Sequence, residues 1–485
     1  MMPQERYQKL EALLSRENPA LLDIISSYKD LDKVGHKLGL LKAEQSYAEQ
    51  ISWWPLISIL GTFSAGKSSF INHYIGKPMQ TTGNQAVDDK FTVICQGTQQ
   101  EVTTLPGLAL DSDPRFPFYG MSQQIDQVEL GEGSRIDSYL QLKTTQANNL
   151  RGKILIDSPG FDADSQRDAT LRLTNHIIDL SDLVLVFFDA RHPEPGAMRD
   201  TLEHLVASTR KRHDADKVLY ILNQIDTAAK EDNLEEIIGS WQRALSSQGL
   251  IGGNFFAIYN EAAAAEFSDQ GVSERFQRKR EADIAKIFQR MDKVSIERSY
   301  RIARALDNIS ADITQSRINQ ISRQLDKWKK RVLLADTLAL SLVVAVISFI
   351  MNLFGAFETP VSEWALSTAM LESSALSLTL GTIFAGLLFA GHHLIRQKLA
   401  QWQYKRLLKK GQEVLANAFQ HNTPFWRSIF QTQPRGWGKQ SRKLLTSVSQ
   451  SSKKAIQKLN DQFTNPSGDD EKTATTATNR KTSTP

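Results

Sequence analysis

The 485-residue sequence contains a single cysteine, Cys95. One thiol can supply neither an internal disulfide framework nor a cysteine zinc site, so the chain does not depend on either. This usage fits a reducing compartment. The polar opening Met1-Met2-Pro3-Gln4-Glu5-Arg6 lacks the apolar core of a secretion signal, and we expect no cleaved leader.

Metal-ligand spacing is also missing among the histidines. His192, His204, His392 and His393 fall into no ligand pattern with a cysteine, and we interpret them as surface or interfacial residues.

Acidic residues are scarce in one long stretch of the chain. Between Arg396 and Lys458 the only acidic residue is Glu413, although the net charge of the whole chain is just +4. Such a basic block is typical of a segment that binds an anionic partner, either lipid headgroups or nucleic acid. A solvated helical face is the alternative interpretation.

Apolar periodicity predicts an α/β domain preceded by helices. Leucines at three- and four-residue spacing predict two helices before residue 50, separated at Asn18-Pro19. Short apolar runs then alternate with helix-like segments, which predicts a mostly parallel sheet with helices on both faces. The predicted strands cover residues 55–60, 153–156, 183–188, 218–222 and 255–258.

The first predicted strand leads into a segment with the spacing of a phosphate-binding loop, Gly61-Thr62-Phe63-Ser64-Ala65-Gly66-Lys67-Ser68-Ser69. Gly61 and Gly66 allow the backbone to curl and turn its N–H groups toward phosphate oxygens. The following helix N-terminus adds positive partial charge. Lys67 supplies a cation for the β- and γ-phosphates, and the Ser68 hydroxyl supplies a ligand for Mg²⁺. The alternative is a glycine-rich turn before an ordinary helix.

Two further segments follow in the order that a nucleotide-binding domain requires. Asp157-Ser158-Pro159-Gly160 ends an apolar strand, and we expect Asp157 to hold Mg²⁺ through water and the Gly160 N–H to meet the γ-phosphate. By itself this segment is also typical of a simple turn.

The second segment is Asn223-Gln224-Ile225-Asp226, directly after a predicted strand. The Asp226 carboxylate can accept hydrogen bonds from the N1–H and the 2-amino group of guanine, a donor pair that adenine lacks. Gln224 stands where a lysine is usual. The segment favours guanine over adenine.

Residues 58–69, which end in Ser-Ala-Gly-Lys-Ser-Ser, resemble the phosphate loop of the dynamin superfamily. Asp157-Ser158-Pro159-Gly160-Phe161 and Phe187-Phe188-Asp189-Ala190 resemble the G domain of the Eps15-homology-domain ATPases and of bacterial dynamin-like proteins. The likeness covers about residues 55–260; beyond it only the architecture of helical stalk plus membrane element is similar.

The resemblance implies a nucleotide-driven cycle of G-domain pairing and membrane remodelling. It implies that Ser64 helps to position the catalytic machinery. Phe63 stands where dynamins place a water-orienting glutamine, which implies slow hydrolysis. Asp88 aligns with the switch threonine that closes over Mg²⁺, with Thr81 or Thr82 as alternatives. Because the Eps15-homology relatives use ATP, ATP stays the alternative to GTP.

Two long apolar runs predict a membrane hairpin. Residues 332–357 reach the length of about 20 residues that spans a bilayer. The second run, 376–391, reaches it only when counted from Ala365 and across Glu372. Lys and Arg flank the pair and are absent from the connection, which carries Glu358 and Glu363, so both arms are expected in the cytoplasm.

Small and aromatic residues support the hairpin. Gly381 and Gly386 allow close helix approach, and Trp364 occupies an interfacial position. The alternatives are a shallow, reversibly inserted paddle and a buried helical hairpin, which Asp336 and Glu372 favour because charge in lipid is costly.

These patterns and the resemblance predict a membrane-anchored dynamin-like GTPase at a bacterial inner membrane that binds anionic lipids. The resemblance implies homodimers or higher oligomers formed through the G domain. The rival hypotheses are a nucleotide-gated scaffold with little hydrolysis, an ATP-using relative, and, least favoured, nucleic-acid binding by the basic arm.

The predicted parts are N-terminal helices packing on the stalk (1–50), a dynamin-type G domain (51–270), a helical stalk (271–331), the apolar hairpin (332–395), a basic helical arm (396–463) and a disordered tail (464–485). The predicted nucleotide-binding residues are Gly61, Thr62, Phe63, Ser64, Ala65, Gly66, Lys67, Ser68, Ser69, Asp157, Gly160, Asn223, Gln224 and Asp226. The predicted catalytic residues are Ser64 and Lys67, and the predicted Mg²⁺ ligands are Ser68, Asp157 and Asp88.

Overall fold

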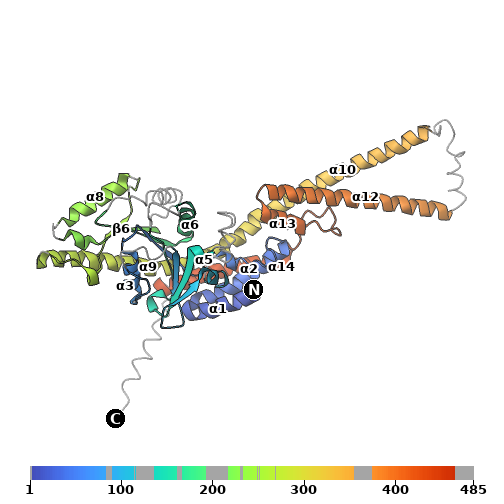
Figure 1. Ribbon diagram of the computed structural model, residues 1–485. Coiled ribbons are helices and arrows are strands. Elements are labelled where there is room, and N and C mark those ends of the chain that lie inside the picture. Colours follow the sequence, from blue (N-terminus) through green and yellow to red (C-terminus); the bar gives the residue numbers. More distant parts are fainter. Residues whose placement is uncertain are drawn as a thin grey trace, which may run out of the picture. The chain divides into compact units, whose positions relative to one another are not determined.

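The computed structural model of the chain divides into two compact units (Figure 1). The first contains the described parts of residues 1–22, 48–303 and 456–485, and the second contains those of 23–47 and 304–455. The structure describes residues 3–82, 90–113, 115, 136–160, 167–192, 217–229, 233–247, 249–250, 252–267, 269–353 and 374–464.

The first unit is built on a sheet that has eight strands within the described residues, in the order β3-β4-β2-β5-β1-β6-β7-β8. Neighbouring strands run parallel from β5 to β8 and between β2 and β4, whereas β2–β5 and β3–β4 are antiparallel. The strands are β1 (Leu56–Gly61), β2 (Phe91–Gln96), β3 (Thr103–Pro106), β4 (Leu140–Thr145), β5 (Ile154–Asp157), β6 (Leu183–Asp189), β7 (Val218–Asn223) and β8 (Asn254–Ala257). Because the carboxyl ends of parallel strands share one edge, Gly61, Asp157 and Asn223 meet there.

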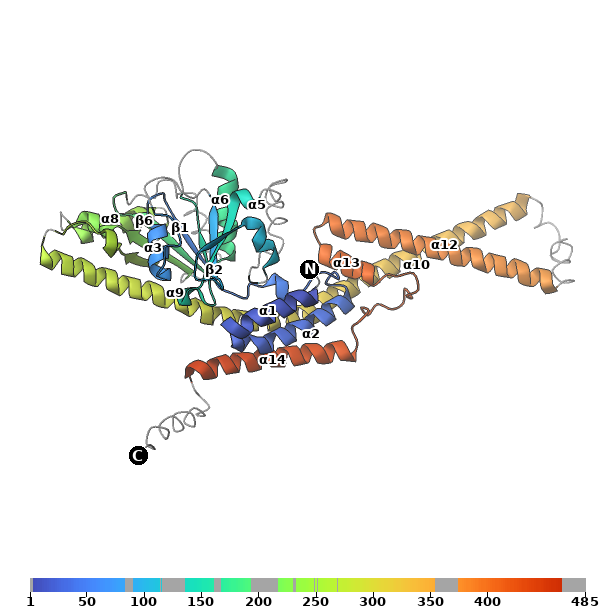
Figure 2. The same cartoon turned by 60° about the horizontal axis from the view of Figure 1, so that its bottom comes forward.

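Helices cover both faces of this sheet (Figure 2). In β6 the alternate residues Leu185 and Phe187 pack on one face, and Val186 and Phe188 pack on the other. The first face is covered by α3 (Lys67–Ile75) and part of α9 (Gln270–Asp312), and the second by α6 (Arg167–Leu180) and α8 (Leu234–Ser247). A strand buried on both faces is apolar at every position, which is the pattern of a central parallel strand.

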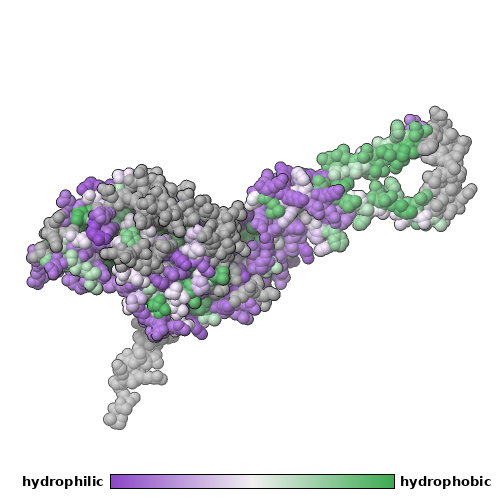
Figure 3. Space-filling view, in the orientation of Figure 1, coloured by the Kyte–Doolittle hydropathy of each residue, from purple (hydrophilic) through white to green (hydrophobic). Residues whose placement is uncertain are grey.

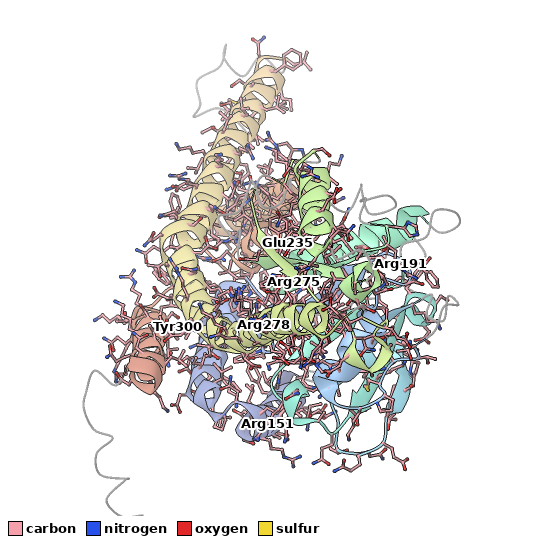
Figure 4. All side chains as sticks on the ribbon, turned by 90° about the vertical axis from the view of Figure 1, so that its left-hand side faces the viewer. Arg151, Arg191, Glu235, Arg275, Arg278 and Tyr300 are labelled. Atoms are coloured by element: carbon pink, nitrogen blue, oxygen red, sulfur yellow. The ribbon has the colours of Figure 1, made fainter. Side chains whose placement is uncertain are left out.

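Residues from both ends of the described chain bond to α9 in the first unit. Asn18 follows helix α1 (Pro3–Glu17), and its side-chain amide donates to Ser299 Oγ at 3.3 Å. The hydroxyl of Tyr300, labelled in Figure 4, donates to Asn460 of α14 (Lys439–Thr464) at 2.8 Å. A short helix, α5 (Ile136–Tyr139), precedes β4.

The second unit is helical. It contains α2 (Leu22–Leu38) from Asp23 onward, the end of α9, α10 (Ile318–Leu353), α12 (Ser374–Lys409), α13 (Glu413–His421) and most of α14. A π-helical turn at Ile313–Arg317 joins α9 to α10, so that one continuous helix runs over Gln270–Leu353. The predicted α/β domain with a helical stalk is therefore confirmed.

The two predicted apolar helices are also present. The helices Gln270–Leu353 and Leu378–Lys409 each contain a stretch that is long and apolar enough to cross a membrane, and no residue of these stretches is buried. Figure 3 shows them as the continuous hydrophobic surface of α10 and α12. Glu358, Glu363, Trp364, Ala365 and Glu372 lie outside the described residues.

The core beneath α8 predicts how the G-like unit responds to truncation. Trp241 is fully buried and meets the Phe188 and Phe255 rings edge-on, each at 5.5 Å between ring centroids. Its indole N–H finds no acceptor among the described residues. We expect Trp241→Ala to lower the free energy of unfolding by about 3–5 kcal/mol, measured by denaturant titration, because it opens a cavity. Trp241→Phe removes the unpaired N–H and should cost much less; equal losses would contradict this account.

Candidate functional site

The loop between β1 and α3 curls as the glycine spacing predicts. Ser64 and Gly66 both have left-handed backbone, with φ of 59° and 83°. Alternation of left- and right-handed residues turns successive N–H groups toward one side and forms a concave site for anions. The loop opens onto the N-terminus of α3, whose first turn carries Ser68 and Ser69. Backbone dipole and helix terminus thus favour negative charge at the same point.

Lys67 places its ammonium within this loop. Its Nζ donates to the carbonyl oxygens of Gly61 at 3.0 Å and Thr62 at 3.1 Å, and the side chain is only 8% exposed. Burial lowers the pKa of Lys67, while the nearby carboxylate of Asp157 acts in the opposite direction. Among the described residues the Lys67 ammonium bonds only neutral carbonyl oxygens, so an anion that enters the loop is stabilised by its charge.

Two side-chain amides hold the loop from the end of β7. Asn223 Nδ2 donates to the carbonyl oxygen of Ala65 at 2.8 Å, and Gln224 Nε2 donates to that of Ser64 at 2.5 Å. Gln224 itself has left-handed backbone, with φ of 65°. We call this pair the amide clamp. It joins residues about 160 positions apart and fixes the turn that shapes the phosphate loop.

Gly66 is required by this clamp as well as by its backbone angle. A Cβ added at Gly66 would lie 2.1 Å from Asn223 Nδ2, far inside van der Waals contact. Gly160 is packed similarly, because its added Cβ would lie 3.0 Å from the Cα of Phe63. The segment after β5 therefore touches the phosphate loop through Gly160, where the sequence predicted a phosphate-contacting N–H.

Asp226 is the second residue of the short 3-10 helix Ile225–Ala228, which follows Gln224. It is 6% exposed, and its Oδ2 accepts from the Ala265 N–H at 2.9 Å. Burial raises the pKa of Asp226, and the hydrogen bond from Ala265 and the charge of Arg191 partly oppose this effect. Arg191, labelled in Figure 4, forms a two-point ion pair with Asp189 at the end of β6. A buried carboxylate of this kind suits a ligand that presents N–H donors.

Asp157 is held by a polar relay that the sequence did not reveal. Gln80 Nε2 donates to Asp157 Oδ2 at 2.6 Å, and Lys143 Nζ donates to Gln80 Oε1 at 2.5 Å. All three side chains are less than 10% exposed. Gln80 thus connects a carboxylate at the end of β5 to a cation on β4, through a chain of hydrogen bonds in a region of low dielectric.

Asn72 of α3 fixes the position of Gln80. Its Oδ1 accepts from the N–H groups of Met79 and Gln80, both at 2.8 Å, and its Nδ2 donates to the Gln80 carbonyl. The same helix that begins at the phosphate loop therefore orients the relay. Thr81 and Thr82 follow and are exposed. Asp88, the predicted switch ligand, lies outside the described residues.

A small pocket opens beside the phosphate loop on the side of α9. Arg280 borders it, donates to the Tyr259 carbonyl at 2.9 Å and pairs with Glu261 at 3.1 Å. The lining residues are Ser69, Phe70, His73, Asn223, Ile258, Tyr259, Asn260, Arg280 and Ile284. The pocket thus adjoins both the first turn of α3 and the amide clamp.

The donor set fits Mg²⁺. The ion takes hard oxygen ligands, uses one or two protein groups and keeps its remaining waters or phosphate oxygens. Ser68 in the first turn of α3 and the buried carboxylate of Asp157 provide such ligands beside Lys67. Among the described residues, no group of three or more His, Cys, Asp or Glu side chains could hold a metal ion, so waters or phosphate oxygens would complete its ligands.

Residues 57–225 match the sequence model of the dynamin family. The chain therefore carries a dynamin-family domain over these residues. The matched residues begin in β1 and end just after Gln224, so they contain the phosphate loop, Asp157 and the amide clamp. The region that matches the dynamin family therefore carries the site.

Curated relatives resemble the same region. EH domain-containing protein 1 of Arabidopsis thaliana is 25% identical over 180 residues, which are 36% of this chain and 30% of that protein. EH domain-containing protein 2 of the same plant is 26% identical over 180 residues, with the same coverage. The chain therefore matches less than a third of the length of these relatives.

Solved bacterial dynamins are similar over more of the chain. One is an oligomerised bacterial dynamin pair described as sensing and tethering membranes at long range, with 14% identity, 98% of this chain and 77% of that chain covered, and a TM-score of 0.31. Another is LeoA, a bacterial dynamin GTPase from ETEC, with 13% identity, 94% and 78% coverage, and a TM-score of 0.31. At these scores the assignment rests on the dynamin family match alone.

Gly66 and Gly76 provide a matched test of the amide clamp. Both have left-handed backbone, but a Cβ at Gly76 meets nothing within 4 Å. Each alanine substitution should cost about 1–2 kcal/mol of stability through backbone strain. Only Gly66→Ala should also weaken triphosphate binding, by roughly a hundredfold, because its Cβ displaces Asn223. Fluorescent-nucleotide titration measures this, and equal affinities in the two variants would refute the role of the clamp.

The relay predicts a specific loss of metal-dependent binding. In Gln80→Leu the buried ammonium of Lys143 loses its closest partner, and Asp157 loses one hydrogen-bond donor. We therefore expect the gain in nucleotide affinity on adding Mg²⁺ to be about tenfold smaller than in the wild type. Adding Lys143→Met should recover stability, because it removes the orphaned cation, but should not recover the Mg²⁺ effect. The relay has no part in metal binding if the Mg²⁺ dependence of Gln80→Leu equals that of the wild type in isothermal titration.

Proposed function

We propose that this dynamin-superfamily chain binds GTP with Mg²⁺ at the loop 61–69, hydrolyses it, and uses the cycle to remodel or tether a membrane in which its apolar helices are anchored. The observation that carries the proposal is the amide clamp. It brings the loop that suits phosphate and the segment that suits a base into direct contact, as one nucleotide site requires.

Guanine recognition is assigned to Asp226. Its carboxylate is buried and already accepts one backbone N–H, so its remaining lone pairs suit the adjacent donors of guanine. The Asn223 side chain is committed to the phosphate loop, and Gln224 is directed to the Ser64 carbonyl rather than extended as a lysine stem would be. ATP, which offers no paired donors, is the alternative substrate.

Hydrolysis is proposed as in-line attack of water on the γ-phosphate. Lys67 and the loop N–H groups stabilise the charge that develops on the phosphate oxygens. Ser68 and Asp157 would hold Mg²⁺, which would neutralise part of the charge on the phosphates. Ser64, held through its carbonyl by Gln224, positions the loop. Phe63 has no group that orients water, so unassisted turnover is expected to be slow.

Membrane anchoring is proposed for α10 and α12. Large apolar side chains along both helices face outward, including Leu342 at 66% and Phe389 at 72% exposure, which a buried hairpin of this unit would cover. Asp336, which favoured the buried alternative, is paired with His392 Nδ1 at 2.8 Å, so its charge is not isolated. Basic residues at both bases favour a cytoplasmic location for the arms, at the inner face of a bacterial membrane.

The proposed division of labour follows the predicted parts. The G domain binds and hydrolyses the nucleotide and pairs with a second copy. The continuous helix through α9 and α10 transmits the resulting conformational change. The basic arm contacts anionic lipid. Superfamily membership supports the pairing.

A nucleotide-gated scaffold that barely hydrolyses GTP is the second candidate. Phe63 favours it, because this position lacks the water-orienting side chain of dynamins. In this reading the same site binds nucleotide and recruits partners to the membrane.

Turnover of purified protein with GTP or ATP, with and without anionic liposomes, distinguishes these functions. We expect GTP to bind more tightly than ATP and liposomes to raise GTP turnover. Lys67→Ala should abolish both binding and turnover, because it removes the only cation seated in the loop among the described residues. Intact binding in Lys67→Ala would refute the site, whereas binding without turnover under every condition would select the scaffold.

A further inference from the structure

Large aromatic side chains are exposed in the turn that follows α13. Phe425, Trp426 and Phe430 are 62%, 65% and 64% exposed, in a segment that we call the aromatic turn, residues 424–430. Phe425 and Trp426 meet edge-to-face at 4.9 Å between ring centroids. Contiguous exposed aromatics are unusual on a soluble surface and mark a site of interaction.

Two buried guanidinium groups hold the aromatic turn in place. Arg396 of α12 is 6% exposed and donates to the carbonyl oxygens of Pro424 and Arg427. Arg427 is 7% exposed and donates to Asn422, both to its carbonyl at 3.0 Å and to its Oδ1 at 2.5 Å. The backbone is thus fixed while the aromatic rings point outward, so little conformational entropy remains to be lost when they bind.

The aromatic turn lies where the apolar surfaces of α10 and α12 end. The Phe425 ring meets His393 edge-on at 6.0 Å, and His393 stacks on Phe389, which belongs to the exposed apolar run of α12. On the other helix, Lys329 Nζ lies 5.2 Å from the centroid of the Phe430 ring. Lys329 and His393 are polar residues at the bases of the two apolar runs. The turn is therefore continuous with the hairpin surface and level with its boundary.

Charge around the turn favours lipid over a protein surface as the occupant. Lys327 and Lys330 are exposed on α10 close to Lys329, and the stretch that contains the turn has no acidic residue after Glu413. Aromatic rings at the edge of an apolar segment, flanked by cations, match the chemistry of a bilayer interface, with acyl chains on one side and anionic phosphates on the other.

We propose that the aromatic turn is a second membrane contact. Phe425, Trp426 and Phe430 enter the headgroup region of an anionic bilayer and set the depth to which the hairpin inserts. This inference rests on the proposed insertion of α10 and α12, but it assigns the contact to a segment outside both apolar runs.

Site-specific fluorophores test the proposal in the full chain. With Cys95→Ala as background, an NBD label is attached at Trp426→Cys, at Phe384→Cys in the apolar run of α12, or at Lys443→Cys on the exposed side of α14. Each protein is reconstituted in phosphatidylcholine–phosphatidylglycerol vesicles. Quenching by a lipid nitroxide near the headgroups is compared with quenching by aqueous iodide.

We expect the Trp426 label to be quenched by the lipid nitroxide and protected from iodide, and the Lys443 label to behave in the opposite way. The Phe384 label reports hairpin insertion separately. Lipid quenching at Phe384 with iodide quenching at Trp426 would overturn the proposal while preserving the membrane hairpin. Lipid quenching at neither position would overturn both. Lipid quenching at Trp426 alone would mean that the turn contacts lipid without an inserted hairpin, and would also overturn the proposal. Protection of Trp426 from both quenchers would indicate a protein contact and also overturn the proposal.

A depth measurement tests the second half of the proposal. In Phe425→Ala/Trp426→Ala/Phe430→Ala, the Phe384 label should lose quenching by a nitroxide at the bilayer centre, because the hairpin is no longer held at its depth. Val414→Ala, which truncates an exposed apolar residue outside the turn, should leave it unchanged. Identical depth profiles in the triple variant and the wild type would overturn the depth-setting role.

Discussion

The site depends on one interaction, the grip of two side-chain amides on the backbone of the phosphate loop. Left-handed backbone is costly at Ser64 but not at Gly66, and Gln224 and Asn223 stabilise this conformation by bonding the Ser64 and Ala65 carbonyl groups. The carbonyl groups are turned toward β7, and the N–H groups are left for an anion. The shape of the cradle is therefore determined at the end of a strand about 160 residues further along the chain.

Asp157 is likewise oriented by side-chain amides. Its carboxylate is oriented by Gln80, and Gln80 is oriented by Asn72 on the helix that starts at Lys67. One helix thus links the cation, the carboxylate and the beginning of the segment that follows residue 80. Hydrogen bonds through Gln80 therefore tie the position of the Asp157 carboxylate to helix α3.

The strands β1, β5, β6, β7 and β8 and the phosphate loop were predicted from sequence, whereas β2, β3, β4 and the side-chain contacts between elements were not. β6 is apolar from Leu183 to Phe188 because it is buried on both faces, and the spacing from Gly61 to Ser68 is typical of phosphate-binding loops. β4 carries Gln141, Lys143 and Thr144 among its apolar residues, so its strand character is masked. The contact of Gln80 with Lys143 depends on the packing of the sheet, to which no local pattern points. Gln224 was predicted as a nucleotide-binding residue, but its side chain donates to the Ser64 carbonyl, a contact that no local pattern indicates.

The most direct test of this account is an experimental structure with Mg²⁺ and a non-hydrolysable GTP analogue. It should show the triphosphate within the loop 61–69, Lys67 Nζ transferred from the Gly61 and Thr62 carbonyls to phosphate oxygens, Asp157 on the metal side, and Asn223 still bonded to Ala65. A triphosphate bound elsewhere, or Lys67 retained on the two carbonyls with nucleotide present, would contradict it.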